Sequence, residues 1–164
     1  MIRGLAAFIK KNNVGLDIHF VEKGPHVAVS KQLADEVGLT PYITWHKEMS
    51  LKEVMDFYIK ADIIFDHLGQ HIIGGGMHAM AAGRPVIANA RPDIFEKITG
   101  VESQICHATN EVEVEAWLTK LVFDYNFRIE KGKRSRDYAL QYLNIEIEAD
   151  FFIAALQEIL SQQK

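Results

Sequence analysis

A glycine triplet that leads directly into a run of small residues is the feature that most constrains the fold of this chain. Gly74–Gly76 precede Met77–Ala82, a segment that predicts a short helix ended by Gly83. Apolar strands are predicted on both sides of this unit, at 61–65 and at 85–88. Glycines let a backbone approach a ligand closely, and the first turn of a helix carries unpaired N–H groups. A turn of this kind suits a diphosphate at the carboxyl end of a strand.

Strands and helices alternate along the rest of the sequence. Further strands are predicted at 16–21, 42–45 and 103–106, and helices at 2–11, 26–37, 50–60, 93–98, 111–124, 127–143 and 145–160. This alternation predicts an α/β fold, a Rossmann-like doubly wound parallel sheet flanked by helices. We expect a single domain over residues 1–164, a length that suits one hydrophobic core.

The first predicted element is a helix, whereas a doubly wound domain normally begins with a strand. We therefore expect the first strand of the sheet, and any chain before it, to lie upstream of Met1. Without that strand, the sheet would have an incomplete edge or a neighbour supplied by another chain.

Composition narrows the possible classes of function. The net charge of −4 and the pI of about 6.0 disfavour a broad nucleic-acid-binding surface. The single cysteine, Cys106, excludes an intrachain disulfide and is typical of a reducing compartment. No apolar run approaches the ~18 residues of a membrane span. We therefore expect a cytoplasmic protein that does not bind nucleic acid.

A basic run and a group of His and Asp residues each allow two interpretations. The basic run at 131–136 could touch an anionic membrane surface, which would make the protein membrane-associated, but the flanking Glu130 and Asp137 favour a solvated helix face. His67 and His71, together with Asp66, could suggest a metal site. Because Gly69 interrupts a continuous helix through the two histidines, we expect no metal there.

Four motifs share the pattern of one known family. Phe20–Pro25 resembles its strand and glycine–proline turn, 42–47 its base-binding strand and loop, and 51–63 its helix ending in Tyr-x-x-Ala-Asp. Residues 78–88 match Glu-Ala-Met-Ala-x-Gly-x-Pro-Val-Ile-Ala at every fixed position except the first. The chain thus resembles the C-terminal, nucleotide-sugar-binding domain of two-domain retaining glycosyltransferases. These are the group 1, or family 4-like, enzymes of the GT-B fold.

The resemblance implies a function and partners. It implies a domain that holds a nucleoside-diphosphate sugar, whose sugar is moved to an acceptor, with no further cofactor. The acceptor site of this family lies in an N-terminal domain, which is not contained in these residues. The resemblance therefore implies that this chain needs such a domain as its partner, and that it does not complete a catalytic cycle alone.

The resemblance also implies site residues. Two glutamates of the family are replaced by Gln70, which would contact the donor sugar, and by His78, which would meet the ribose. Lys23 and Arg84 are the nearby cations for a diphosphate, with Lys23 better placed along the chain. The complete set of expected donor contacts is Lys23, Gly24, His46, Gln70, Gly74, Gly75, Gly76 and His78. The residues that would carry catalysis are not identified by this pattern.

Three functions follow from these features. The first is the donor domain of a glycosyltransferase. The second is a catalytically degenerate nucleotide-binding or regulatory module, which the replacements at Gln70 and His78 favour. The third is a sugar-nucleotide epimerase of related two-domain build. A dinucleotide oxidoreductase is disfavoured because no Gly-x-Gly-x-x-Gly follows a first strand.

Overall fold

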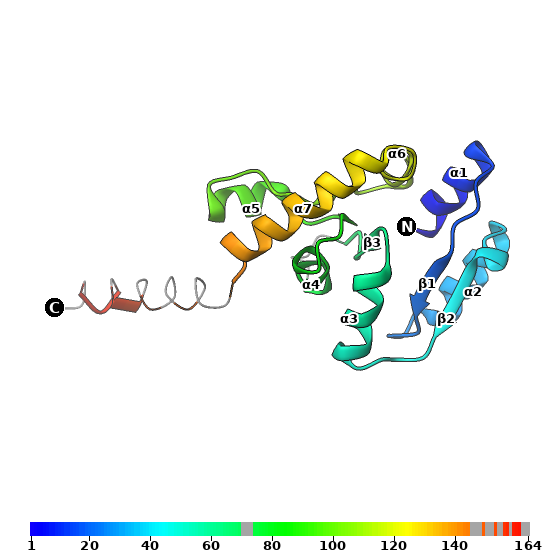
Figure 1. The fold of residues 1–164 in the computed structure, drawn as a ribbon. Coiled ribbons are helices and arrows are strands. Elements are labelled where there is room, and N and C mark those ends of the chain that lie inside the picture. The colour runs from blue at the N-terminus through cyan, green and yellow to red at the C-terminus, as the bar shows by residue number, and fades with distance from the viewer. Residues whose placement is uncertain (70–73, 145–148, 150–152, 154–155, 158, 162–164) are drawn as a thin grey trace.

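The computed structural model describes residues 1–69 and 74–144, together with positions 149, 153, 156, 157 and 159–161 (Figure 1). Its elements are α1 (Ile2–Asn12), β1 (Ile18–Val21), α2 (Val27–Glu36), the short 3-10 turn η1 (Thr40–Tyr42), β2 (Ile43–His46), α3 (Leu51–Lys60), β3 (Ile64–Phe65), α4 (Gly75–Ala81), β4 (Val86–Ala88), α5 (Pro92–Thr99), β5 (Cys106–His107), α6 (Glu111–Phe123) and α7 (Tyr125–Tyr142). The predicted order of helices and strands is confirmed. The helix predicted at 145–160 lies mostly outside the described residues.

All strand pairs of the structure are parallel, as the sequence predicts for an α/β fold. They form two separate ladders among the described residues: β1 pairs with β2, while β4 lies between β3 and β5. One continuous sheet was expected, with any incompleteness at its edge. The pairing is instead interrupted between the two ladders, since no strand among the described residues joins them.

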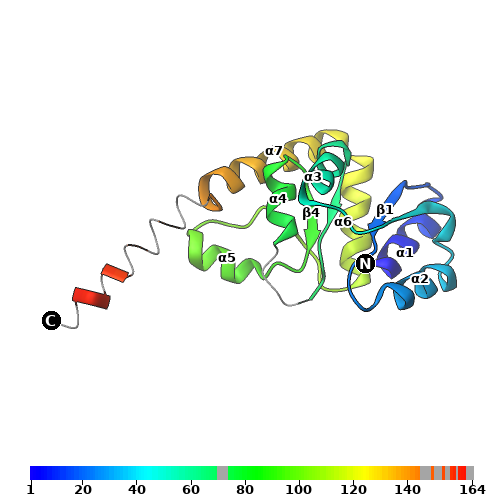
Figure 2. The same ribbon diagram turned by 90° about the horizontal axis from the view of Figure 1, so that it is seen from below.

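A shared layer of helices holds the two ladders in one body. Helices α1 and α6 cross closely, since a Cβ added at Gly4 would lie 2.6 Å from Val114 Cγ1. Their buried Leu5, Phe8 and Leu118 belong to one core cluster with Ile18 of the first ladder and Ile87 of the second. Figure 2 shows α1 and α6 together on this part of the molecule.

A second cluster forms where α4 and α7 pack together. Ala79 and Met80 of α4 are fully buried, and Tyr138 and Ala139 of α7 pack in the same cluster. The two elements come together at Gly132, where an added Cβ would collide with the Gly83 carbonyl oxygen. This packing follows the Ala-Met-Ala-Ala-Gly run, whose small side chains allow a close helix approach.

In the basic run at 131–136, Lys133, Arg134 and Arg136 are exposed on α7, as predicted for a solvated helix face, whereas Lys131 is half-buried. Lys131 donates to Gln104 Oε1 (3.3 Å), and Arg136 donates to the Ala81 carbonyl (2.5 Å). Arg134 pairs with Glu130 within the helix (2.9 Å). Burial lowers the pKa of Lys131. The expectation of a solvated face is therefore wrong for Lys131, because α7 turns this side toward α4 and the Gln104 loop.

Side-chain caps set the starts of three helices. Ser50 and Glu53 form a capping box at the start of α3, with the Ser50 N–H donating to Glu53 Oε2 (2.8 Å). Asn110 Oδ1 accepts from the N–H groups of Val112 and Glu113 at α6 (both 3.0 Å). Asp124 caps α7 through the Phe127 N–H (2.8 Å). These contacts hold each helix start beside the strand or loop that precedes it.

Candidate functional site

The glycine turn is tied to the end of β3 by a carboxylate. Asp66 directly follows β3, and its Oδ2 accepts a hydrogen bond from the Gly76 N–H (3.0 Å). Its Oδ1 accepts from the His67 N–H (2.9 Å). Asp66 therefore fixes the start of α4 against the carboxyl end of the second ladder, where open α/β folds bind ligands.

The backbone of the first two glycines in the turn is accessible from outside the protein. Gly74 and Gly75 are exposed, whereas Gly76 is buried. A Cβ added at Gly74 would meet nothing within 4 Å, and one at Gly75 would lie 3.3 Å from Tyr58 Oη. Burial, reinforced by the Asp66 charge, raises the pKa of Tyr58. A neutral Tyr58 hydroxyl and an accessible glycine backbone thus lie next to each other.

Asn89 is a further polar group at this edge. It follows β4 directly and is 5% exposed. Its Nδ2 donates to the Leu68 carbonyl and its backbone N–H to the His67 carbonyl, each over 3.2 Å. Its Oδ1 is buried and has no hydrogen-bond partner among the described residues. Sequence reasoning missed Asn89, although a polar residue directly after the apolar strand Val86–Ala88 was the available signal.

The other predicted contacts gather at the end of the first ladder. His46 Nε2 lies 2.8 Å from His19 Nδ1, and their rings stack with centroids 5.1 Å apart. The Phe57 ring packs against both of them. Lys23 pairs with Glu48 over 3.3 Å, with both side chains largely exposed. Gly24 takes a φ of +85°, a backbone conformation that favours glycine.

The predicted site residues thus form two groups. Lys23, Gly24 and His46 lie at the carboxyl ends of β1 and β2, while the glycine triplet and His78 lie at α4. No hydrogen bond or ion pair between described residues joins the two groups. His78 is exposed on α4, and Gln70 lies outside the described residues.

The Arg84 side chain, one of the two cations suggested for a diphosphate, contacts α3 instead. Its guanidinium Nη2 donates to the Ile59 carbonyl at the end of α3, and its Nε is buried without a partner among the described residues. This contact ties the turn after α4 to α3. Of the two candidate cations, Lys23 is therefore the one whose side chain remains largely exposed.

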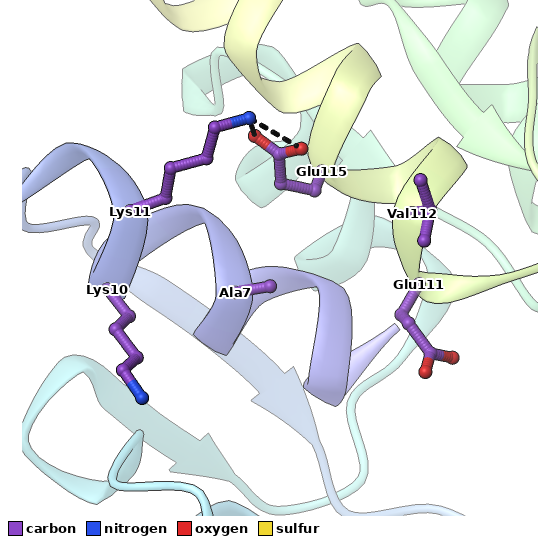
Figure 3. A pocket seen from close by; sticks show the side chains of 6 residues that line it. All are labelled: Ala7, Lys10, Lys11, Glu111, Val112 and Glu115. Atoms are coloured by element: carbon purple, nitrogen blue, oxygen red, sulfur yellow. Dashed lines mark hydrogen bonds and ion pairs between the residues drawn. The ribbon is translucent and has the colours of Figure 1, made fainter.

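A shallow groove of about 510 Å³ lies between α1 and α6, away from both groups. Figure 3 shows the Lys11 ammonium bridging the two helices to the Glu115 carboxylate, at 3.0 and 3.2 Å. The apolar side chains of Ala7 and Val112 also line it. None of the predicted donor contacts lines this groove, so it is not part of the candidate site.

The described residues hold neither a cluster of metal-ligating side chains nor a helix that could cross a membrane. No cluster of three or more His, Cys, Asp or Glu side chains in the described part of the chain has an arrangement that could hold a metal ion. No helix within the described residues combines the length and the apolar character needed to cross a membrane.

Comparison with known proteins supports the fold. No protein-family model matches the sequence. No curated protein sequence matches it either. A solved structure does match, that of a sucrose-phosphate synthase from Thermosynechococcus elongatus, with a TM-score of 0.75 and 16% sequence identity. The chain has a glycosyltransferase-like α/β fold.

The match extends over 98% of this chain and 42% of the synthase chain. The present chain thus spans less than half the length of that enzyme. At this level of identity the likeness establishes the fold, and it leaves the activity to be argued from the residues.

Proposed function

We propose that this chain is the donor-binding part of a glycosyltransferase, and that it holds a nucleoside-diphosphate sugar at the glycine turn before α4. The observation that carries the proposal is the open Gly74–Gly75 backbone at the carboxyl end of β3. The likeness to a sucrose-phosphate synthase over nearly the whole chain supports it. In such a site, backbone N–H groups would stabilise the leaving diphosphate.

Each residue group would have a distinct role. Gly74 and Gly75 leave room for the diphosphate to approach the backbone, because no side chain stands over Gly74. His78, exposed on the same helix, would meet the ribose hydroxyls. His46 and Lys23 at the end of the first ladder would face the base and the diphosphate, respectively. The acceptor and the remaining catalytic groups would come from a further domain.

A second candidate function is a nucleotide-binding or regulatory module that does not transfer sugar. The observation that favours it is the contact of Asp66 with Gly76. Among the described residues, Gly76 is the only glycine of the triplet whose N–H donates a hydrogen bond, and its acceptor is an internal carboxylate. This negative charge disfavours a diphosphate at the same N–H group.

Calorimetric or NMR titration of the folded chain with UDP, GDP and ADP tests donor binding. We expect one of the three to bind selectively, and Gly74→Val to weaken its affinity by about tenfold or more, since the new side chain would fill the open approach. His78→Ala should weaken it less. Lys133→Ala, on an exposed position of α7, is the matched control and should bind like the parent chain.

Two results would contradict the proposal. One is the absence of binding at millimolar nucleotide in a sample that is folded by circular dichroism. The other is equal affinity of the parent chain and the Gly74→Val variant. Sugar transfer by a longer protein that contains this chain, lowered by His78→Ala, would separate the transferase from the regulatory module.

A further inference from the structure

Two histidines on one face of the first ladder form a hydrogen-bonded pair. His46 ends β2 opposite Val21, so His19 lies one diagonal step away from it on the same face of the ladder. His19 Nδ1 and His46 Nε2 are 2.8 Å apart. The ring centroids are 5.1 Å apart, which is close to this N···N distance plus the two ring radii. The two nitrogens therefore face each other along the line between the ring centres.

The other ring nitrogen of His19 faces a carboxylate. Asp17 directly precedes β1 and lies two residues before His19, and its Oδ2 is 3.2 Å from His19 Nε2. Half a turn of the His19 ring would put carbon atoms at both contacts, so the two contacts together fix the orientation of this ring. A continuous chain of polar contacts thus runs from Asp17 through His19 to His46.

Packing and backbone contacts hold the end of this chain in place. The Phe57 ring of α3 lies nearly edge-on to the His46 ring, with centroids 4.9 Å apart, and 5.5 Å from the His19 ring. The His46 carbonyl accepts the Glu22 N–H (2.7 Å). His46 Nδ1 makes no hydrogen bond to any described residue, and it is not a fully buried atom. This nitrogen is therefore free to meet a ligand.

The chemistry of donors and acceptors then determines which nitrogens carry protons. An ionised carboxylate only accepts hydrogen bonds, so Asp17 requires the N–H of His19 to be at Nε2. The Nδ1 of a neutral His19 is then bare and accepts, so the N–H of His46 has to be at Nε2. The remaining nitrogen, His46 Nδ1, is consequently bare and can only accept a hydrogen bond.

We propose that Asp17 and His19 are positioning residues that hold His46 as the Nε2–H tautomer, so that its Nδ1 accepts a hydrogen bond from the amino group of a nucleobase. This inference rests on the proposed function, in which His46 faces the base. Adenine, guanine and cytosine carry an exocyclic amino group, whereas uracil carries only carbonyl oxygens outside its ring. A bare nitrogen attracts an amino group and repels a carbonyl oxygen. The site therefore prefers a nucleotide with an amino-bearing base over UDP.

NMR of the ring nitrogens, recorded on the chain without nucleotide, tests the proton positions. At about pH 8, where histidine is normally neutral, His46 should carry its proton at Nε2 and show a scalar coupling across the hydrogen bond to His19 Nδ1. Asp17→Ala lacks the carboxylate that selects this direction, so the fraction of His46 with its proton at Nδ1 should rise about twofold or more. Asp17→Asn keeps an acceptor oxygen and should show a smaller rise.

Asp56→Ala is the matched control, because it removes another exposed carboxylate, on α3, that makes no hydrogen bond to either ring. It should leave both ring spectra unchanged. A proton on His19 Nδ1 in the parent chain would overturn the proposal, since the hydrogen bond would then run in the opposite direction. Unchanged proton positions in Asp17→Ala would also overturn it, because His46 would keep its tautomer without the carboxylate.

Titration with paired nucleotides tests the ligand. IDP is the counterpart of ADP and GDP without their amino group, and UDP is the counterpart of CDP. The nucleotide that binds most tightly should carry an amino group, and its counterpart should bind about tenfold more weakly, as expected for one lost hydrogen bond. His46→Phe should remove this difference, Asp17→Ala should reduce it, and Asp56→Ala should retain it.

Tightest binding by UDP would overturn the assignment of the base and leave the proposed donor site intact. A difference retained in His46→Phe would overturn the role of His46 in the same way. Absence of binding by every nucleotide would overturn the base contact together with the proposed function. The ring-nitrogen spectra need no nucleotide, so they decide the role of Asp17 and His19 separately from donor binding.

Discussion

The Asp66 carboxylate accepts the Gly76 N–H over 3.0 Å, and this contact joins the end of a strand to a glycine turn ten residues later. The same carboxylate also accepts the His67 N–H (2.9 Å). One side chain thereby satisfies two backbone donors at the edge where the candidate site lies. The Asp66 carboxylate thus anchors the start of α4, while the packing of Ala79 and Met80 against α7 holds the rest of the helix.

Replacing Asp66 with Ala should destabilise the fold, because the buried Gly76 would lose the acceptor of its N–H group. Loss of an acceptor for a buried donor costs about 1–3 kcal/mol, so urea denaturation should show a decrease of this order in the free energy of unfolding. Asp66→Asn retains a side-chain oxygen and is the control, with a smaller expected loss. Equal stability of the Ala variant and the parent chain would show that the contact does not hold the turn.

Gly132 allows α7 to approach the turn after α4. An added Cβ would collide with the Gly83 carbonyl oxygen, a backbone atom that cannot turn aside. Gly132→Ala should therefore lower the free energy of unfolding by about 1–3 kcal/mol, as overpacked sites do, and lower the melting temperature. Gly74→Ala is the comparison, since its Cβ would meet nothing within 4 Å. A melting temperature for Gly132→Ala equal to that of Gly74→Ala would contradict the close packing.

Local patterns predicted most elements of the fold. The helices predicted at 50–60 and 111–124 correspond to α3 and α6, whose starts are capped by Ser50 and Asn110. Apolar runs predicted the strands, but β3 is limited to Ile64–Phe65 because only these residues pair with β4. Strand length is set by the partner strand, which is distant in sequence.

The contacts of the candidate site were less predictable because they too depend on partners that are distant in the sequence. The His46 ring lies against His19, 27 residues earlier, because the β1–β2 register brings them together, and its contact with a base stays a prediction. Asn89 was missed because its partners, the carbonyls of His67 and Leu68, come from the neighbouring strand end. The division into two ladders also depends on pairing across the sheet, which periodicity along one strand does not encode.

The cap of α6 should contribute to stability in a measurable way. Asn110 Oδ1 accepts two N–H groups of the first turn, and an Asn→Ala change at such a position typically costs about 1 kcal/mol. Asn110→Ala should show this loss in chemical denaturation, whereas Asn110→Asp, which keeps the acceptor, should lose little. Because α6 crosses α1 over the core, the loss should appear in the free energy of global unfolding. Faster hydrogen exchange in the first turn of α6 alone, with an unchanged free energy of unfolding, would contradict this expectation.

The buried thiol of Cys106 should make stability fall at high pH. Burial raises the pKa of the thiol from 9.0 to about 11, although Lys131 and Lys120 oppose the shift. The folded state therefore holds this proton more tightly than the unfolded state does. The resulting stabilisation is complete below about pH 9 and is lost as the pH rises through about 11.

Comparison with Cys106→Ala isolates this effect, because Lys131 and the other basic groups titrate in both proteins. The difference in the free energy of unfolding between parent and variant should be constant up to about pH 9 and should then fall by at most about 2–3 kcal/mol by pH 11. Thiol labelling at pH 8 should likewise be slow in the folded parent and fast in urea. Rapid labelling of the folded chain, or a difference that does not change with pH, would show that the thiol is not held in its neutral form by burial.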